Sequence, residues 1–227
     1  GMSFGPPRPL NPSPRKVAAP YQIDLQVEAN ASGAVFASYL DGKDTVVQRS
    51  DDFGETWSSA VAVNVDIQAS WTDKVGLAVQ ESDVYVSFSN GQKYFVSASH
   101  DGGQTFTPVQ INRRTSDTGW TLTSGGAVDS QGNVYFSWVG VHKSGNASGP
   151  QDVFLTKSTD RGRTWSYIFL AHDVPPGPGC AEFACGWDFW GPQMVVAVDA
   201  ADGVYVAYNA GLVDEGPPYL WFQASTD

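Results

Sequence analysis

Ser50-Asp51-Asp52-Phe53-Gly54-Glu55-Thr56-Trp57 is a stretch that the chain repeats. The same pattern returns as Ser99-His100-Asp101-Gly102-Gly103-Gln104-Thr105-Phe106 and as Ser158-Thr159-Asp160-Arg161-Gly162-Arg163-Thr164-Trp165. A further copy begins at Ser225-Thr226-Asp227. The complete copies all read S-x-D-x-G-x-T-[WF], so the sequence indicates a repeat architecture.

The motif has the composition of a tight turn between antiparallel strands. Its carboxylate can accept backbone N–H bonds within the turn, and its glycine supplies the positive φ that the reversal requires. The Ser and Thr hydroxyls can hold the flanking backbone, and the closing aromatic ring can pack under a neighbouring sheet. We therefore interpret the motif as structural and not catalytic. The residues so assigned are Asp52, Gly54, Trp57, Asp101, Gly103, Phe106, Asp160, Gly162 and Trp165.

Strand-like runs precede and follow each motif. The second run of a unit is apolar and aromatic, as in Val84-Tyr85-Val86, which suits a strand buried between stacked sheets. Four strands per repeat, with the motif's Asp recurring after 49, 59 and 67 residues (52 to 101, 101 to 160, 160 to 227), indicate the blades of a β-propeller. The competing architecture, a β-sandwich, would not repeat a turn motif at one fixed strand position.

The sequence thus predicts an all-β fold, a β-propeller of four-stranded antiparallel blades. Four blades are visible, at about residues 25–65, 75–112, 124–171 and 193–227, after an N-terminal extension at 1–24. The last blade lacks its turn motif and outer strand. Two explanations stay open: a truncated chain whose full ring is larger, or a ring in which Lys16–Gln22 supplies the closing strand.

The net charge and composition limit the kinds of partner that the protein can bind. The 227 residues carry a net charge of −11 with pI near 4.5, so the surface repels phosphate backbones and anionic lipid. No apolar run approaches the roughly 18 residues of a membrane helix. We expect no nucleic-acid or membrane partner. The Pro-rich start shows no signal peptide, so the chain is either a secreted or periplasmic protein whose leader was removed, or cytoplasmic.

Cysteine and histidine placement addresses disulfides and metals. Cys180 and Cys185 lie in one Gly/Pro-rich loop, where a disulfide suits a secreted protein and two free thiols are the alternative. The three histidines, His100, His142 and His172, are scattered and make no ligand spacing. The sequence therefore predicts neither a metal site nor a cofactor.

The loops of such a fold fall on two faces because strand direction alternates. The repeated turns and the first-to-second loops share one face, and the second-to-third and blade-to-blade loops share the other. All long segments fall on that second face, which we call the loop-rich face: 66–74, 113–123, 141–151, 172–192 and 210–218. Aromatic and charged side chains on scaffolded loops are typical of a binding site, and rings beside charged groups suit a sugar.

The ligand-binding candidates on this face are Arg113, Arg114, Trp120, Trp187, Asp188 and Trp190. Trp71, Trp120 and Trp187 each shortly precede an innermost strand, so packing between blades is the alternative role for them. A local salt bridge or turn is the alternative role for Asp73-Lys74.

On these repeats the chain, from residue 25 to 227, resembles the Asp-box (bacterial neuraminidase repeat) propellers, which include sialidases and many non-sialidases. The resemblance implies three arginines that bind a substrate carboxylate, one of them in a Tyr-Arg-Ile-Pro-like motif. Here that stretch reads Tyr21-Gln22-Ile23-Asp24, with Gln in place of Arg. The resemblance also implies a general-acid Asp between the first two blades, where Asp66 and Asp73 both lie. The family's Tyr nucleophile is not carried onto Tyr219.

Two hypotheses follow. In the first, the chain binds a glycan or another small polar ligand, or a protein, without sialidase activity. In the second, it is a glycoside hydrolase, sialidase-like with Asp73 as catalytic acid, or a different enzyme with two carboxylates. The carboxylate candidates are Asp73, Asp117, Asp188, Asp214 and Glu215. A homo-oligomer that completes the last blade is a further expectation, because unpaired strand edges are rarely left uncovered.

Overall fold

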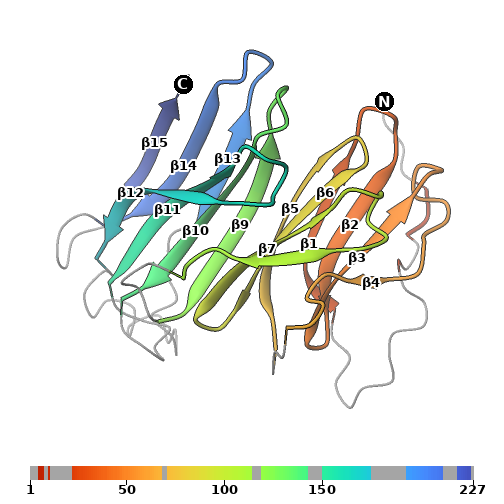
Figure 1. Cartoon of the computed structure of the whole chain (residues 1–227), viewed down its shortest axis with the longest axis horizontal. Coiled ribbons are helices and arrows are strands. Elements are labelled where there is room, and N and C mark those ends of the chain that lie inside the picture. The colour runs from red at the N-terminus through yellow and green to blue at the C-terminus, as the bar shows by residue number, and fades with distance from the viewer. Residues whose placement is uncertain are drawn as a thin grey trace.

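The structure is a computed structural model, and it describes residues 5–7, 10, 22–67, 71–113, 119–142, 150–174, 193–211 and 219–225. In these ranges the chain forms antiparallel sheets and no helix (Figure 1). No described segment could therefore cross a membrane as a helix.

Each sheet is a meander of strands in sequence order. The first sheet contains β1 (Gln22–Ala29), β2 (Val35–Asp41), β3 (Asp44–Ser50) and β4 (Val61–Ala62). The second contains β5 (Asp73–Gln80), β6 (Asp83–Asn90), β7 (Lys93–Ser99) and β8 (Thr107–Gln110). The third contains β9 (Thr121–Val128), β10 (Val134–Val141), β11 (Gln151–Ser158) and β12 (Ser166–Asp173). The fourth contains β13 (Met194–Val198), β14 (Val204–Ala210) and β15 (Tyr219–Ser225).

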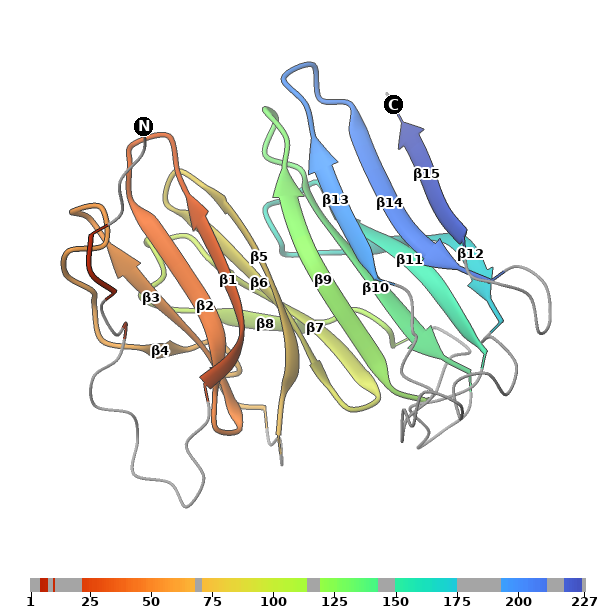
Figure 2. The same ribbon diagram turned by 180° about the vertical axis from the view of Figure 1, so that it is seen from behind.

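The sheets stand side by side as the blades of a propeller. Their first strands, β1, β5, β9 and β13, follow one another across Figure 2, and each contacts the next. The first and fourth sheets lie at opposite ends of this row (Figure 1). The predicted fold class, antiparallel propeller blades, is therefore confirmed.

Three apolar clusters lie between successive sheets and hold the blades together. The middle cluster is the most aromatic: Trp138 of β10 is fully buried and stacks on Tyr94 at 5.0 Å and on Phe154 at 4.3 Å between ring centroids. Stacked rings in this geometry add to the free energy already gained by burying their area. The apolar second strands predicted from the sequence contribute buried residues to all three clusters, together with neighbouring strands.

The Asp boxes occupy equivalent turns, at β3–β4, β7–β8 and β11–β12. In the first box, Asp52 accepts bonds from the Thr56 N–H at 2.8 Å and the Thr56 hydroxyl at 2.6 Å, while Ser50 accepts from the Gly54 N–H at 2.8 Å. Gly54 has a φ of 84°, which glycine adopts without steric cost. The other two boxes repeat these bonds at 2.5–3.0 Å. Donation from Thr56 and Ser50 lowers the pKa of Asp52 to about 2.

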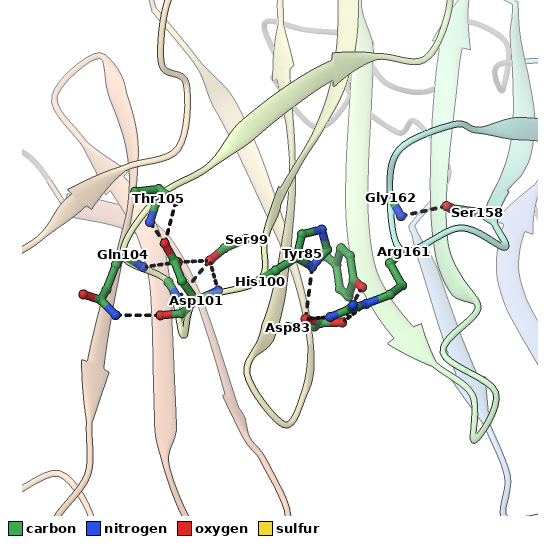
Figure 3. A network of polar contacts seen from close by, with 11 residues as sticks. Asp83, Tyr85, Ser99, His100, Asp101, Gln104, Thr105, Ser158, Arg161 and Gly162 are labelled. Atoms are coloured by element: carbon green, nitrogen blue, oxygen red, sulfur yellow. Dashed lines mark hydrogen bonds and ion pairs between the residues drawn. The ribbon is translucent and has the colours of Figure 1, made fainter.

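Polar contacts also join neighbouring blades on the Asp-box face (Figure 3). Arg161, from the third box, donates two bonds to Asp83 of the second sheet, at 2.8 and 2.6 Å. The same carboxylate contacts His100 at 3.0 Å and accepts from the Tyr85 hydroxyl at 3.2 Å. Burial alone would raise the pKa of Asp83, but the bonds from Arg161 and His100 outweigh it, and the pKa is lowered. This arginine therefore ties the third blade to the second.

Part of the segment that was predicted to close the last blade belongs to the first sheet instead. Gln22, assigned to the segment Lys16–Gln22, opens β1 and pairs with Asp41 of β2. It therefore does not pair with β15, and the rest of that segment lies outside the described residues. Among the described strands, β15 pairs with β14 alone.

Candidate functional site

A groove runs along the first strands of the four sheets, and we call it the central groove. Its volume is about 460 Å³. Most of its lining comes from the first residues of β1, β5, β9 and β13, which lie at the loop-rich end of the sheets because the blade-to-blade loops enter there. The lining residues are Asp24, Gln26, Lys74, Val75, Leu122, Thr123, Ser124, Gln193, Met194, Val195, Ala207, Tyr208, Asn209 and Leu220.

Backbone irregularities shape the groove at β1 and β5. The pairing of β1 with β2 shifts register beside Asp24, and the pairing of β5 with β6 shifts beside Lys74. Both residues have left-handed backbone, with φ of 55° and 52°. A bulge of this kind re-aims a side chain out of the regular pleat. The Lys74 ammonium lies 3.5 Å from the Asp24 carboxylate, so the bulges bring an ion pair from two blades into the groove.

Asp73, the predicted catalytic acid, is the residue that precedes Lys74 at the start of β5. Its carboxylate accepts the Lys74 N–H at 3.0 Å. Burial raises the pKa of Asp73 above its usual value; Lys74 opposes this effect, and the nearby Asp24 adds to it. A carboxylic acid that keeps its proton closer to neutral pH is what general-acid catalysis requires.

Short contacts fix the floor of the groove. The Ser87 and Thr123 hydroxyls, from the second and third sheets, lie 2.6 Å apart. Ser124 of β9 donates to the carbonyl oxygen of Met194 in β13. Gly76 lets β5 approach β9, because a Cβ at this position would lie closer than 3.0 Å to the Ser124 carbonyl oxygen. Direct contacts between neighbouring sheets therefore fix the positions of the strands that line the groove.

Two of the predicted ligand-binding residues lie in the described part of the chain. Trp120, directly before β9, packs against Trp71, two residues before β5, with ring centroids 4.8 Å apart at 48°. Both rings are half-buried, and Arg113 is exposed. The rival acid candidate, Asp66, is exposed with a φ of 59°. The predictions for Arg114, Asp117, Cys180, Cys185, Trp187, Asp188, Trp190, Asp214 and Glu215 fall outside the described residues.

The structure corrects the description of the histidines as scattered. His142, after β10, and His172, in β12, stack with ring centroids 4.9 Å apart. Asp152 of β11 lies between their nitrogens, at 3.0 and 2.8 Å. The sequence missed this cluster because its members are 10 and 20 residues apart (142 to 152, 152 to 172) and meet only through strand pairing.

Sequence reasoning also missed Asp24 as a groove residue. It offered a local salt bridge or turn as the alternative role of Asp73-Lys74, whereas Lys74 also reaches Asp24 in the preceding blade. The usable signal was that Asp24 lies two residues after Gln22, the position at which the family motif has its site arginine.

Comparisons with known proteins agree with the geometry. The BNR/Asp-box repeat matches residues 48–59, and a search of curated protein sequences gave no match. Among solved structures, a Hadza microbial sialidase superposes with a TM-score of 0.63 at 14% identity, over 91% of this chain and 44% of that one. The Trypanosoma rangeli sialidase in complex with sialic acid gives 0.57 at 14% identity, over 91% and 36%. An endo-arabinase from Bacteroides thetaiotaomicron gives 0.53 at 12% identity, over 92% and 76%.

The chain carries an Asp-box repeat on blades of a β-propeller, and its fold is similar to that of these sialidases. It spans less than half the length of the two sialidases. Likeness at such identity concerns the fold, and activity has to be argued from the site.

Proposed function

We propose that the chain binds a carbohydrate at the loop-rich end of the central groove and does not act as a sialidase. The observation that carries this proposal is the lining of the groove. Carboxylate, ammonium and amide groups of Asp24, Lys74 and Gln193 stand beside aliphatic side chains such as Leu122 and Val195. Sugars present hydroxyls and C–H faces together, so a mixed lining suits them.

The Trp71–Trp120 pair supports the same ligand. Both residues lie within two residues of the start of a strand that lines the groove, and their half-buried rings leave aromatic surface toward solvent. An aromatic face is the common partner of a sugar's C–H groups. The Trypanosoma rangeli sialidase, a protein of similar fold, is described in complex with sialic acid.

The absence of sialidase activity rests on Gln22. This side chain is exposed at the first position of β1, where the family motif places an arginine. A neutral amide cannot give a carboxylate the charge-assisted, bidentate pair that arginine gives.

The test is a titration of the protein with sialyllactose and arabino-oligosaccharides, monitored by isothermal calorimetry and saturation-transfer NMR. Trp120→Ala should weaken binding at least tenfold with little loss in melting temperature. Phe53→Ala is the matched control, because Phe53 is an aromatic residue 86% exposed in an Asp box on the opposite face. If Trp120 is only a plug between blades, its loss should cost about 3–5 kcal/mol of stability with no specific binding effect. No binding by the wild-type protein would refute the proposal.

A glycoside hydrolase is the second candidate. Burial raises the pKa of Asp73, and this residue is the neighbour of Lys74 in the lining of the groove, so a proton donor stands beside the groove. Chromogenic sugars distinguish the two. Hydrolysis that Asp73→Asn abolishes, without loss of binding, would establish the enzyme. Release of sialic acid by the wild-type chain would overturn the proposed lack of sialidase activity.

Pairing of β15 with a second chain belongs to the proposal as well. Leu220 and Phe222 on this strand are 88% and 66% exposed, and β14 is its single partner among the described strands. Light scattering of the purified protein should show a dimer that Leu220→Lys disrupts; a monomer at all concentrations would exclude it.

Secretion, with a Cys180–Cys185 bridge, is also proposed, since disulfides persist in oxidising compartments. Alkylation of two free thiols in the native protein would contradict the bridge.

A further inference from the structure

Two histidines and an aspartate meet at the loop-rich end of the third sheet, away from its first strand. Asp152 Oδ1 lies 3.0 Å from His142 Nε2 and 2.8 Å from His172 Nδ1. The three candidate ligand atoms all lie within 4.8 Å of one another. We call these residues the His-Asp-His cluster.

Strand register produces the cluster. Asp152 in β11 stands directly opposite His172 in β12 and opposite Gly140 in β10. Gly140 has no side chain, so the carboxylate is open on that side to His142, two residues further along. Diagonal neighbours of this kind are within reach of long side chains on the same face of a sheet.

The backbone around the cluster is fixed by hydrogen bonds. The His142 N–H donates to the Pro150 carbonyl at 3.0 Å, which extends the pairing of β10 and β11. Asp173, next to His172, is buried and accepts the Gly211 N–H at 2.7 Å, which anchors the end of β12 to the fourth sheet. Ligands that are held on paired strands lose little freedom when they bind an ion.

We propose that the His-Asp-His cluster binds a divalent transition-metal ion of the zinc type. Two imidazole nitrogens and one carboxylate oxygen are ligands typical of zinc, whereas calcium and magnesium prefer oxygen ligands alone. In a tetrahedral zinc site with bonds of about 2.0–2.1 Å, neighbouring ligand atoms lie about 3.3 Å apart. The two distances from Asp152, 3.0 and 2.8 Å, are slightly shorter than that value, and the two histidine nitrogens, which lie within 4.8 Å of each other, would draw together around the ion.

The cluster lies partly open to solvent. The side chains of His142 and His172 are 37% and 45% exposed, while that of Asp152 is 18% exposed. Three protein ligands leave a fourth position for water or for a ligand group, as in zinc sites that exchange ligands. The cluster lies outside the lining of the central groove, so it is a separate site on the same face and does not depend on the proposed carbohydrate binding.

The test is a titration of the EDTA-treated protein with Zn²⁺, by calorimetry and by competition with a chelating dye. One equivalent should bind. His142→Ala, Asp152→Asn and His172→Ala should each weaken it by at least about tenfold, since loss of an outer hydrogen-bond partner alone costs 10–100-fold. His100→Ala, the third histidine, is the matched control and should bind as the wild type does. Ca²⁺ and Mg²⁺ should not compete.

Two further measurements address rival explanations. The double variant Cys180→Ser, Cys185→Ser removes the thiols as an alternative site, and zinc binding should survive it. On the wild-type protein, ¹⁵N chemical shifts of the imidazoles should change for His142 and His172 and not for His100. Absence of binding, loss of binding in the cysteine variant, or binding that all three cluster variants retain would each overturn the proposal. The imidazole shifts decide the matter even where a variant fails to fold.

Discussion

Gly76→Ala tests how closely the blades approach at the groove. Gly76 lies in β5, opposite Ser124 of β9, and a Cβ added there would sit closer than 3.0 Å to the Ser124 carbonyl oxygen and the Ser87 hydroxyl. The serine hydroxyl can rotate, at the expense of its contact with Thr123, but the carbonyl is backbone. Relaxing to an ordinary C···O separation of about 3.3 Å therefore requires the two strands to part by about 1 Å.

Overpacking of this kind costs about 1–3 kcal/mol, and the disturbed hydroxyl contact adds about 1 kcal/mol. The lower backbone entropy of alanine in the unfolded chain offsets about 0.4–1 kcal/mol. The expected net loss is about 1–4 kcal/mol, or a melting temperature lower by about 2–15 °C for a chain of this size. Far-UV circular dichroism during heating, with a urea titration, measures both quantities.

Gly125→Ala is the matched control for this substitution. Gly125 lies in β9, has no positive φ, and has no atom within 4 Å of an added Cβ. Its replacement should leave stability unchanged or raise it by up to about 1 kcal/mol. If Gly76→Ala and Gly125→Ala have the same melting temperature, β5 and β9 do not lie in close contact at Gly76.

Three other predictions concern the blades. Acid should destabilise the fold progressively from about pH 4 to about pH 2. The pKa values of Asp52 and Asp101 are about 2 in the folded protein and near 3.9 in the unfolded chain, so the unfolded chain takes up protons first as the pH falls. A melting temperature that stays constant across that range would contradict the hydrogen bonds of the turns. Arg161→Ala should lower the midpoint of urea denaturation, because Asp83 loses two hydrogen bonds from the neighbouring blade, whereas Arg163→Ala should lower it far less. Equal losses for the two variants would show that Arg161 does not join the blades. Trp138→Ala should cost about 3–5 kcal/mol in the same assay, and a loss below 1 kcal/mol would show that the aromatic stack is not packed.

The fold was predictable from local sequence. A serine, an aspartate, a glycine and a threonine at fixed spacing form the turn through bonds that span at most four residues, as in Ser50 to Gly54 and Asp52 to Thr56. Such bonds depend on neighbours in the chain, so the repeat of the motif already implied a repeat of the blade. The apolar second strands indicated burial between sheets for the same reason, since alternation and composition are local properties.

The predicted start of the first blade was less accurate. The run from Leu25 looked like the strand, whereas β1 begins at Gln22 and passes through a bulge at Asp24. A bulge interrupts the two-residue alternation on which a strand is recognised, so its first residues look like part of a loop.

The candidate sites depended on tertiary structure. Asp24 meets Lys74 across 50 residues (24 to 74), and Asp83 meets Arg161 across 78 (83 to 161), because stacking of the blades brings their edges together. The His-Asp-His cluster needs the register of three strands, and in particular Gly140 opposite Asp152. Shifting a register by one residue turns every side chain to the other face, and the register is set only when the turns close and the apolar faces pack against a neighbouring sheet. The sequence by itself therefore determined the blades and their turns, while the side chains that meet between strands and between blades were decided by how the sheets pair and stack.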